Sequence, residues 1–287
     1  MAERAISDDH LPIGYCLVGV QKAATSTLHS ILGRHPRVAS PGKKELHFFD
    51  NESRSWDPPD YADYRAARTT PRQTLAGEAT PIYLFWPRAL ERMRAYDADM
   101  RLIACFRDPI ERAFSHWTMQ AVRDPSHPSF PDVVEHWTRG VVPSEVPTGP
   151  AARKLRTHSV VDRGLYGAQL RRGLDLFPRE QWLLLDFHRV VREQEQTAAV
   201  LTEFLGLPAF ERVPSPRQRH RSSTGLDAAP ITAAVIGRLA DVFADDLAEF
   251  AALSGLDVGA WPTARVLSGE LDPALLADQL SLKVRLV

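Results

Sequence analysis

This 287-residue chain has two cysteines, no long apolar run and almost no net charge. The two cysteines, Cys16 and Cys105, fall inside apolar runs that we expect to be core strands, which argues against a disulfide framework or a metal site. No apolar run approaches the roughly 20 residues that cross a membrane. The polar N-terminus carries no secretion signal, so we expect a soluble, cytoplasmic protein. A formal net charge of −1 argues against a broad nucleic-acid-binding surface.

Internal repeats, low-complexity linkers and charge blocks are also missing, so nothing in the chain marks a domain boundary. A chain of this length can bury a substantial core, and we expect a single domain over residues 1–287. Residues 123–160 differ from the rest because they are rich in proline and show little periodicity. Such an excursion fits a lid or substrate-binding segment and a plain surface loop about equally well.

Apolar runs alternate with amphipathic segments along the chain. We expect core strands at residues 15–20, 101–106 and 181–187. Helices are expected after Lys22 and at residues 87–96, 109–122, 165–177, 194–205 and 230–253. This order predicts an α/β fold with a central, mainly parallel sheet flanked by helices. Ligands of such sheets bind beyond the carboxyl ends of the strands, where Lys22 and Arg107 are expected to lie.

Lys22 belongs to residues 19–27 (Gly-Val-Gln-Lys-Ala-Ala-Thr-Ser-Thr), between the first expected strand and the first expected helix. A lysine, backbone N–H groups and three hydroxyls at a helix start make a site for an anion. The triphosphate loop G-x-x-x-x-G-K-[ST] does not fit, because Val20 follows Gly19 and the lysine comes later. The alternative is an ordinary strand-to-helix turn with a solvated lysine.

Glu45 lies in a second informative segment, residues 43–50 (Lys-Lys-Glu-Leu-His-Phe-Phe-Asp). Desolvation by the neighbouring phenylalanines would raise the pKa of its carboxyl group and produce a usable general base. An edge strand with alternating exposed charges is the competing interpretation of this segment.

Arg107 begins a third segment, in which Asp108 is expected to cap a helix that starts at Pro109. An apolar stripe on this helix leaves Ser115 to one side. Arg107 and Ser115 together could bind a second phosphate group. The alternative is a capped helix with an exposed arginine.

These segments together resemble the sulfotransferases that use 3′-phosphoadenosine 5′-phosphosulfate (PAPS), and most closely the heparan-sulfate-type and related bacterial enzymes. The resemblance spans about residues 13–207 in the family's order. The segments that carry it are residues 19–27, 45–49 (Glu-Leu-His-Phe-Phe), 77–83 (Gly-Glu-Ala-Thr-Pro-Ile-Tyr), 107–115, 163–166 (Arg-Gly-Leu-Tyr) and 177–181 (Phe-Pro-Arg-Glu-Gln). It implies a P-loop-like three-layer fold in one sulfotransferase domain, with residues 123–160 as a lid or acceptor-binding segment.

The resemblance also implies a role for each site residue. Lys22 would stabilise the leaving nucleotide, Glu45 would be the general base, and His47 would orient Glu45 or the acceptor. Arg107 and Ser115 would hold the 3′-phosphate of the donor. The remaining candidates for donor binding are Gln21, Ala23, Ala24, Thr25, Ser26, Thr27, Tyr166, Arg219 and Arg221. No metal is required.

Two departures from the family pattern affect the expected site. Ala23 and Ala24 replace a common glycine pair, which would alter the approach of the backbone to the phosphosulfate. Ala79 stands where heparan-type enzymes usually carry a lysine on the acceptor side, so acceptor handling would differ. Arg219 and Arg221 belong either to a loop that caps the donor or to a solvated basic turn.

The acceptor is expected to be a hydroxyl or amine of a small molecule, a glycolipid or a saccharide, and the alanine-, arginine- and proline-rich composition suits a bacterial enzyme of natural-product or carbohydrate sulfation. Two other functions stay open. An ATP-dependent small-molecule kinase would need Mg²⁺, for which Asp108 is a weak ligand. A non-catalytic nucleotide- or glycan-binding module would tolerate loss of Glu45.

Overall fold

The structure is a computed structural model that describes residues 9–137, 146, 148–213 and 230–285. The chain forms two compact units. Unit 1 comprises Met1–Phe106 and Gly173–Arg217, and unit 2 comprises Arg107–Arg172 and Gln218–Val287. A single domain over residues 1–287 stays a prediction.

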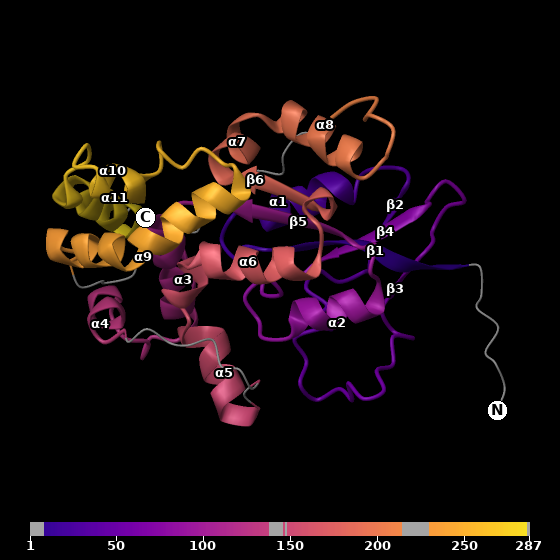
Figure 1. The fold of residues 1–287 in the computed structure, drawn as a ribbon, viewed down its shortest axis with the longest axis horizontal. Helices are drawn as coiled ribbons and strands as arrows, with labels where there is room; N and C mark the ends of the chain where they lie inside the picture. The colour runs from indigo at the N-terminus through magenta and orange to yellow at the C-terminus, as the bar shows by residue number, and fades with distance from the viewer. Residues whose placement is uncertain (1–8, 138–145, 147, 214–229, 286–287) are drawn as a thin grey trace. The chain divides into compact units, whose positions relative to one another are not determined.

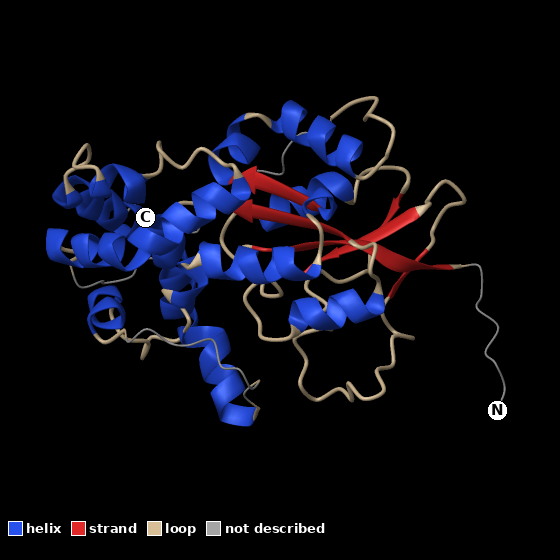
Figure 2. Cartoon of the chain, in the orientation of Figure 1, coloured by secondary structure: helices blue, strands red, loops and turns tan. Residues whose placement is uncertain are grey.

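Unit 1 is built on a sheet with the strand order β2-β4-β1-β5-β6, in which all neighbouring strands are parallel (Figures 1 and 2). A short strand, β3 (Arg65–Ala67), pairs antiparallel with the beginning of β1. The other strands are β1 (His10–Gly19), β2 (Val38–Ala39), β4 (Leu75–Ala79), β5 (Arg101–Phe106) and β6 (Trp182–Asp186). The predicted α/β fold with a mainly parallel sheet is confirmed.

The three strands predicted from apolar runs are β1, β5 and β6. Cys16 and Cys105 are buried and unpaired in β1 and β5, as expected. Sequence patterning did not predict β4, because Leu-Ala-Gly-Glu-Ala lacks the β-branched residues typical of strands. Its place depends on packing instead: a Cβ at Gly77 would lie 2.0 Å from the Tyr15 ring, so only glycine fits beside this neighbour on β1.

Helices cover both faces of this sheet. Figure 1 shows α1, α7 and α8 on one side and α2 on the other. Their bounds are α1 (Thr25–Leu32), α2 (Ala89–Tyr96), α7 (Phe187–Arg192) and α8 (Gln194–Phe204), with a 3₁₀ turn, η2, at Arg179–Gln181. This arrangement gives the three-layer architecture that was predicted.

The described part of unit 2 is helical. Its elements are α3 (Pro109–Arg123), α4 (Phe130–Glu135), α5 (Gly149–His158), η1 (Asp162–Gly164), the first turns of α6 (Tyr166–Leu176), α9 (Ala233–Ser254), α10 (Pro262–Leu267) and α11 (Pro273–Arg285). The predicted apolar stripe of α3 is buried and packs in one core with α4, α9 and α11.

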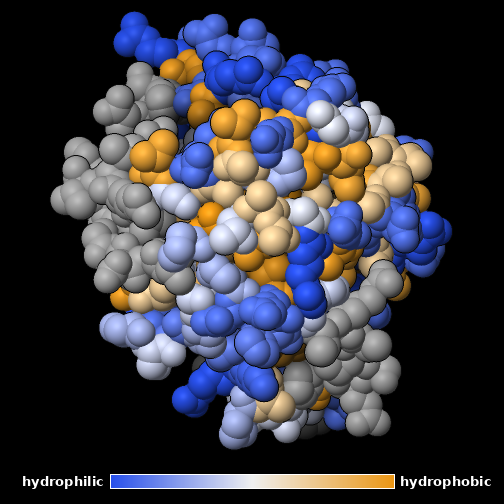
Figure 3. Space-filling model, turned by 90° about the vertical axis from the view of Figure 1, so that its left-hand side faces the viewer, coloured by the Kyte–Doolittle hydropathy of each residue, from blue (hydrophilic) through white to orange (hydrophobic). Residues whose placement is uncertain are grey.

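The proline-rich excursion contains α4 and α5, while residues 138–145 and 147 lie outside the described residues. Its role as a lid or acceptor-binding segment stays a prediction. Leu267, Leu275 and Leu282 are among the exposed apolar side chains. On the face drawn in Figure 3, apolar and hydrophilic residues are interspersed, as on most proteins. None of the described helices is long and apolar enough to cross a membrane.

Candidate functional site

The loop between β1 and α1 has an unusual backbone. Lys22 and Ala24 both adopt left-handed conformations, with φ of 75° and 55°. Glycine favours this region, whereas other residues pay about 1–2 kcal/mol to enter it. The glycine that the family pattern led us to expect would therefore suit position 24, while Ala23 has no positive φ and is buried.

The start of α1 is left available to an anion. Ala24 at the N-cap position makes no side-chain hydrogen bond to the helix, and the first turn contains no acidic residue. Helix N-termini carry a partial positive charge from their amide groups. Of the predicted donor-binding residues here, Thr25 is buried, and the side chains of Gln21, Lys22, Ser26 and Thr27 are half-buried.

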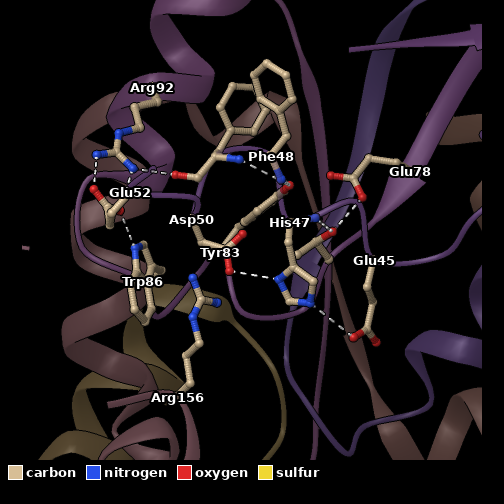
Figure 4. A network of polar contacts seen from close by, with 12 residues as sticks. Glu45, His47, Phe48, Asp50, Glu52, Glu78, Tyr83, Trp86, Arg92 and Arg156 are labelled. Atoms are coloured by element: carbon tan, nitrogen blue, oxygen red, sulfur yellow. Dashed lines mark hydrogen bonds and ion pairs between the residues drawn. The ribbon is translucent and has the colours of Figure 1, made fainter. Parts of the chain in front are cut away.

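Glu45 and His47 lie in a loop after β2, not in an edge strand. Both adopt left-handed backbone conformations, with φ of 61° and 52°. The Glu45 carboxylate lies 2.6 Å from Lys44 Nζ. It also lies 3.7 Å from His47 Nε2, the contact drawn in Figure 4. The side chains of Glu45 and His47 are 42% and 43% exposed, so solvent and a ligand can reach them.

The prediction that the pKa of Glu45 would be raised is wrong. His47 and Lys44 lower the pKa of this carboxyl group to about 2, because their attraction to the charged form outweighs the opposing effect of burial. The Phe48 and Phe49 rings pack on Tyr64 instead. Glu45 is therefore an ionised acceptor at neutral pH.

Asp50 is a site residue that our sequence analysis did not single out. It is fully buried, and its Oδ2 lies 2.8 Å from His47 Nδ1. A carboxylate at Nδ1 fixes the orientation of the ring, so that Nε2 faces Glu45. The three-residue spacing from His47 was visible in the sequence, but the loop conformation that brings the two groups together was not.

Arg107 precedes α3 in unit 2. As predicted, Asp108 caps the helix: its Oδ1 accepts the Glu111 N–H at 2.9 Å, and its Oδ2 accepts the Thr263 N–H at 2.7 Å. Glu111, one turn on, lies 3.3 Å from Arg107 Nε and 2.6 Å from Lys283 Nζ on α11. Arg107 is mostly buried rather than exposed, which disfavours a merely solvated arginine.

The other predicted donor-binding residues of unit 2 have different environments. Ser115 is half-buried on α3, off its apolar stripe as expected. Tyr166 is fully buried against Phe250, and its hydroxyl donates to the Arg107 carbonyl at 2.9 Å. Tyr166 thus holds the Arg107 backbone. Arg219 and Arg221 lie outside the described residues.

The structure thus brings together the predicted residues Glu45 and His47 in unit 1, and Arg107 and Tyr166 in unit 2. It adds Lys44, Asp50, Glu111 and Lys283 to them. Lys22 belongs to unit 1 and Ser115 to unit 2. Their roles, like those of all these residues, stay predictions.

Comparisons with known proteins point to one family. Human heparan sulfate glucosamine 3-O-sulfotransferase 3B1 is 31% identical over 194 residues, which is 67% of this chain and 45% of that protein. The mouse heparan sulfate glucosamine 3-O-sulfotransferase 6 is 31% identical over 193 residues, or 67% of this chain and 51% of that protein. The chain therefore spans about half the length of these curated relatives.

A solved structure agrees with the sequence comparisons. The crystal structure of a sulfotransferase from Alicyclobacillus acidocaldarius has a TM-score of 0.65 and 27% identity, and the match covers 88% of this chain and 99% of that one. The model of the sulfotransferase domain family matches residues 14–226, which include every motif that carried the predicted resemblance. This protein belongs to the sulfotransferase family.

Proposed function

We propose that this protein transfers a sulfuryl group from PAPS to a hydroxyl or amine of a saccharide or small-molecule acceptor. The observation that carries the proposal is the half-exposed, ionised Glu45 carboxylate, held by Lys44 and His47 in a chain of this family. In PAPS the sulfuryl group is bonded to a good leaving group, 3′,5′-diphosphoadenosine. The protein therefore has to position the reactants and stabilise the charge that develops.

Glu45 would act on the acceptor. As the acceptor oxygen or nitrogen forms its bond to sulfur, the bond from sulfur to the phosphate oxygen breaks and Glu45 takes the acceptor's proton. His47 would hold the carboxylate in place, itself held by Asp50. Lys22 would stabilise the negative charge that develops on the departing 3′,5′-diphosphoadenosine.

The residues around the α1 start would hold the 5′-phosphosulfate, since the N-cap residue makes no side-chain hydrogen bond to that helix and its first turn carries no acidic residue. Arg107 and Ser115 would hold the 3′-phosphate. A saccharide acceptor is supported by the names of the curated relatives, which act on heparan sulfate glucosamine. Ala79 is buried at the end of β4, so this chain would bind its acceptor without a charged side chain at that position.

Calorimetric titration tests the donor directly. We expect the full chain to bind 3′,5′-diphosphoadenosine without Mg²⁺, and to bind ADP and ATP much more weakly because they lack the 3′-phosphate. Tighter binding of ATP with Mg²⁺ than of 3′,5′-diphosphoadenosine would contradict the proposal and favour a kinase.

A further inference from the structure

Arg92 is a largely buried arginine that the proposed reaction does not use. It lies on α2 and forms two parallel hydrogen bonds with Glu52: Nη1 donates to Oε1 at 2.7 Å, and Nη2 donates to Oε2 at 2.6 Å (Figure 4). The side chains of Arg92 and Glu52 are only 11% and 14% exposed. Such a bidentate pair fixes both the plane and the direction of the guanidinium group.

The surroundings of this pair keep it charged and in place. Burial raises the pKa of the Glu52 carboxyl group, but the hydrogen bonds from Arg92 and Trp86 outweigh that effect and lower the pKa. The indole N–H of Trp86 donates to Glu52 Oε1 at 2.8 Å. Trp56 covers the guanidinium, with Arg92 Cζ 4.2 Å from its ring centroid. The guanidinium of Arg92 therefore has one well-defined position.

The same guanidinium also holds the main chain next to Asp50. Its Nη1 donates a further hydrogen bond to the Phe49 carbonyl at 2.7 Å. That carbonyl belongs to the planar peptide group that joins Phe49 to Asp50. Because the pair with Glu52 sets the direction of Nη1, Arg92 fixes the backbone from which the Asp50 side chain extends.

A second contact holds the other end of this short segment. The hydroxyl oxygen of Tyr83 accepts the Phe48 N–H at 2.8 Å, and Phe48 directly follows His47. The peptide groups after His47 and before Asp50 are thus both held by side chains from outside the segment. Between them, His47 Nδ1 lies 2.8 Å from Asp50 Oδ2.

The segment needs this support because its backbone is strained. His47 has a φ of 52°, in the left-handed region, a conformation that persists only where the surroundings enforce it. A rotation of the Phe49–Asp50 peptide group would move Asp50 Oδ2 away from His47 Nδ1. His47 Nε2 would then turn from the Glu45 carboxylate, which it faces at 3.7 Å.

We infer that Arg92 is a positioning residue for sulfuryl transfer: by holding the peptide group before Asp50, it keeps that side chain against His47. Glu45, which His47 faces, is thereby held in its working position. Arg92 touches neither substrate nor reacting atoms in this role. The role rests on the proposed function of Glu45.

Arg92→Lys and Arg101→Lys form a matched pair for the test. Arg101, on β5, is also a half-buried residue of unit 1, and its Nη1 donates to the main-chain carbonyl of Phe204 at 2.8 Å. Both substitutions keep the positive charge and remove the planar guanidinium group. The Arg92 bond reaches the segment that carries His47 and Asp50, whereas the Arg101 bond lies at the end of α8.

Turnover of PAPS labelled in its sulfate group is measured on the full chain with a panel of saccharide and small-molecule acceptors. We expect Arg92→Lys to lower kcat about 10-fold or more at unchanged KM for PAPS, since small displacements of a reacting group have such effects. Arg101→Lys should stay within about threefold of wild type in kcat. If Arg92→Lys does not fold, Glu52→Gln replaces it, because it weakens the same pair, and should lower kcat at unchanged KM for PAPS.

A double substitution separates positioning from a general loss of order. Asp50→Asn weakens the group through which Arg92 acts. In that background, Arg92→Lys should lower kcat by no more than about twofold further, because residues that act through one another are not additive.

Equal kcat in Arg92→Lys and Arg101→Lys, or losses that multiply in the double variant, would overturn the inference. A rise in KM for PAPS without a fall in kcat would do the same. If the wild-type chain transfers no sulfuryl group, the proposed function fails, and the NMR signals of the His47 ring decide the placement. A change of these signals in Arg92→Lys but not in Arg101→Lys would support it, and unchanged signals in both would overturn it.

Discussion

At the scale of single residues, the Glu45 carboxyl group combines a pKa near 2 with a half-exposed position. The low pKa guarantees the ionised form at neutral pH but makes the group a weak base. In a loose sulfuryl-transfer transition state little proton transfer is needed until the new bond forms, so a well-placed weak base suffices. In the proposed reaction, the placement of Glu45, which His47 and Asp50 would maintain, then matters more than its basicity.

The segment around Glu45 shows how far single residues can be predicted from sequence. Glu45 was singled out from its residue type and its aromatic neighbours, and His47 from the family resemblance; their roles stay predictions. The direction of the pKa shift was wrong because the sequence does not show which side chains face the carboxylate: Lys44 and His47 do, and the phenylalanines pack elsewhere.

Ala24 gives a prediction at the same scale. Its left-handed backbone costs about 1–2 kcal/mol that glycine would not incur, partly offset by the greater entropy of an unfolded glycine. We expect Ala24→Gly to raise the free energy of unfolding by up to about 1 kcal/mol. Chemical denaturation measures the change.

Ala23→Gly is the control for this loop, because Ala23 is buried without a positive φ. It should lower the free energy of unfolding by about 0.5–1 kcal/mol. Destabilisation by both substitutions would show that the strain at position 24 is not relieved by glycine.

At the scale of elements, local signals predicted only part of the helices and strands. The elements that were not predicted are β2, β3, β4, α4, α5, α7, α10 and α11. The Asp-Pro start of α3 and its apolar stripe were visible in the sequence, and both are present in the structure. The short strands β2 and β4 were missed because they depend on pairing with distant residues rather than on their own composition. The contact between α11 and α3 could not be predicted from local sequence either, because 172 positions separate Lys283 from Glu111.

That contact leads to a prediction for donor binding. The Glu111 carboxylate lies between Arg107 and Lys283. Without the lysine, the negative charge of Glu111 would compete with the 3′-phosphate of the donor for Arg107. We expect Lys283→Met to weaken binding of 3′,5′-diphosphoadenosine about two- to fivefold, the range for a partly exposed ion pair. Binding of adenosine 5′-phosphosulfate, which lacks the 3′-phosphate, should change less.

Lys154→Met provides the control, because Lys154 is an exposed lysine of the same unit. It should leave both affinities unchanged. An equal loss for the two nucleotides in Lys283→Met would argue against a role at the 3′-phosphate.

At the scale of the whole molecule, the family match and the structure divide the chain differently. The family model ends at residue 226, yet α9 and α11 share one core with α3, which lies inside the matched region. The helices beyond the match are therefore part of the structure that supports Arg107. The order of motifs predicted the family, but the division into two compact units has no sequence signal, because no linker marks it.

Sulfuryl transfer assisted by Glu45 is tested most directly by one assay. Transfer from PAPS labelled in its sulfate group to a panel of saccharide and small-molecule acceptors is measured for wild type, Glu45→Gln and the exposed-residue control Glu91→Gln. We predict transfer by wild type and the control, and a loss of about 100-fold or more in kcat for Glu45→Gln. Near-native turnover by Glu45→Gln, with the same affinity for PAPS, would contradict the account.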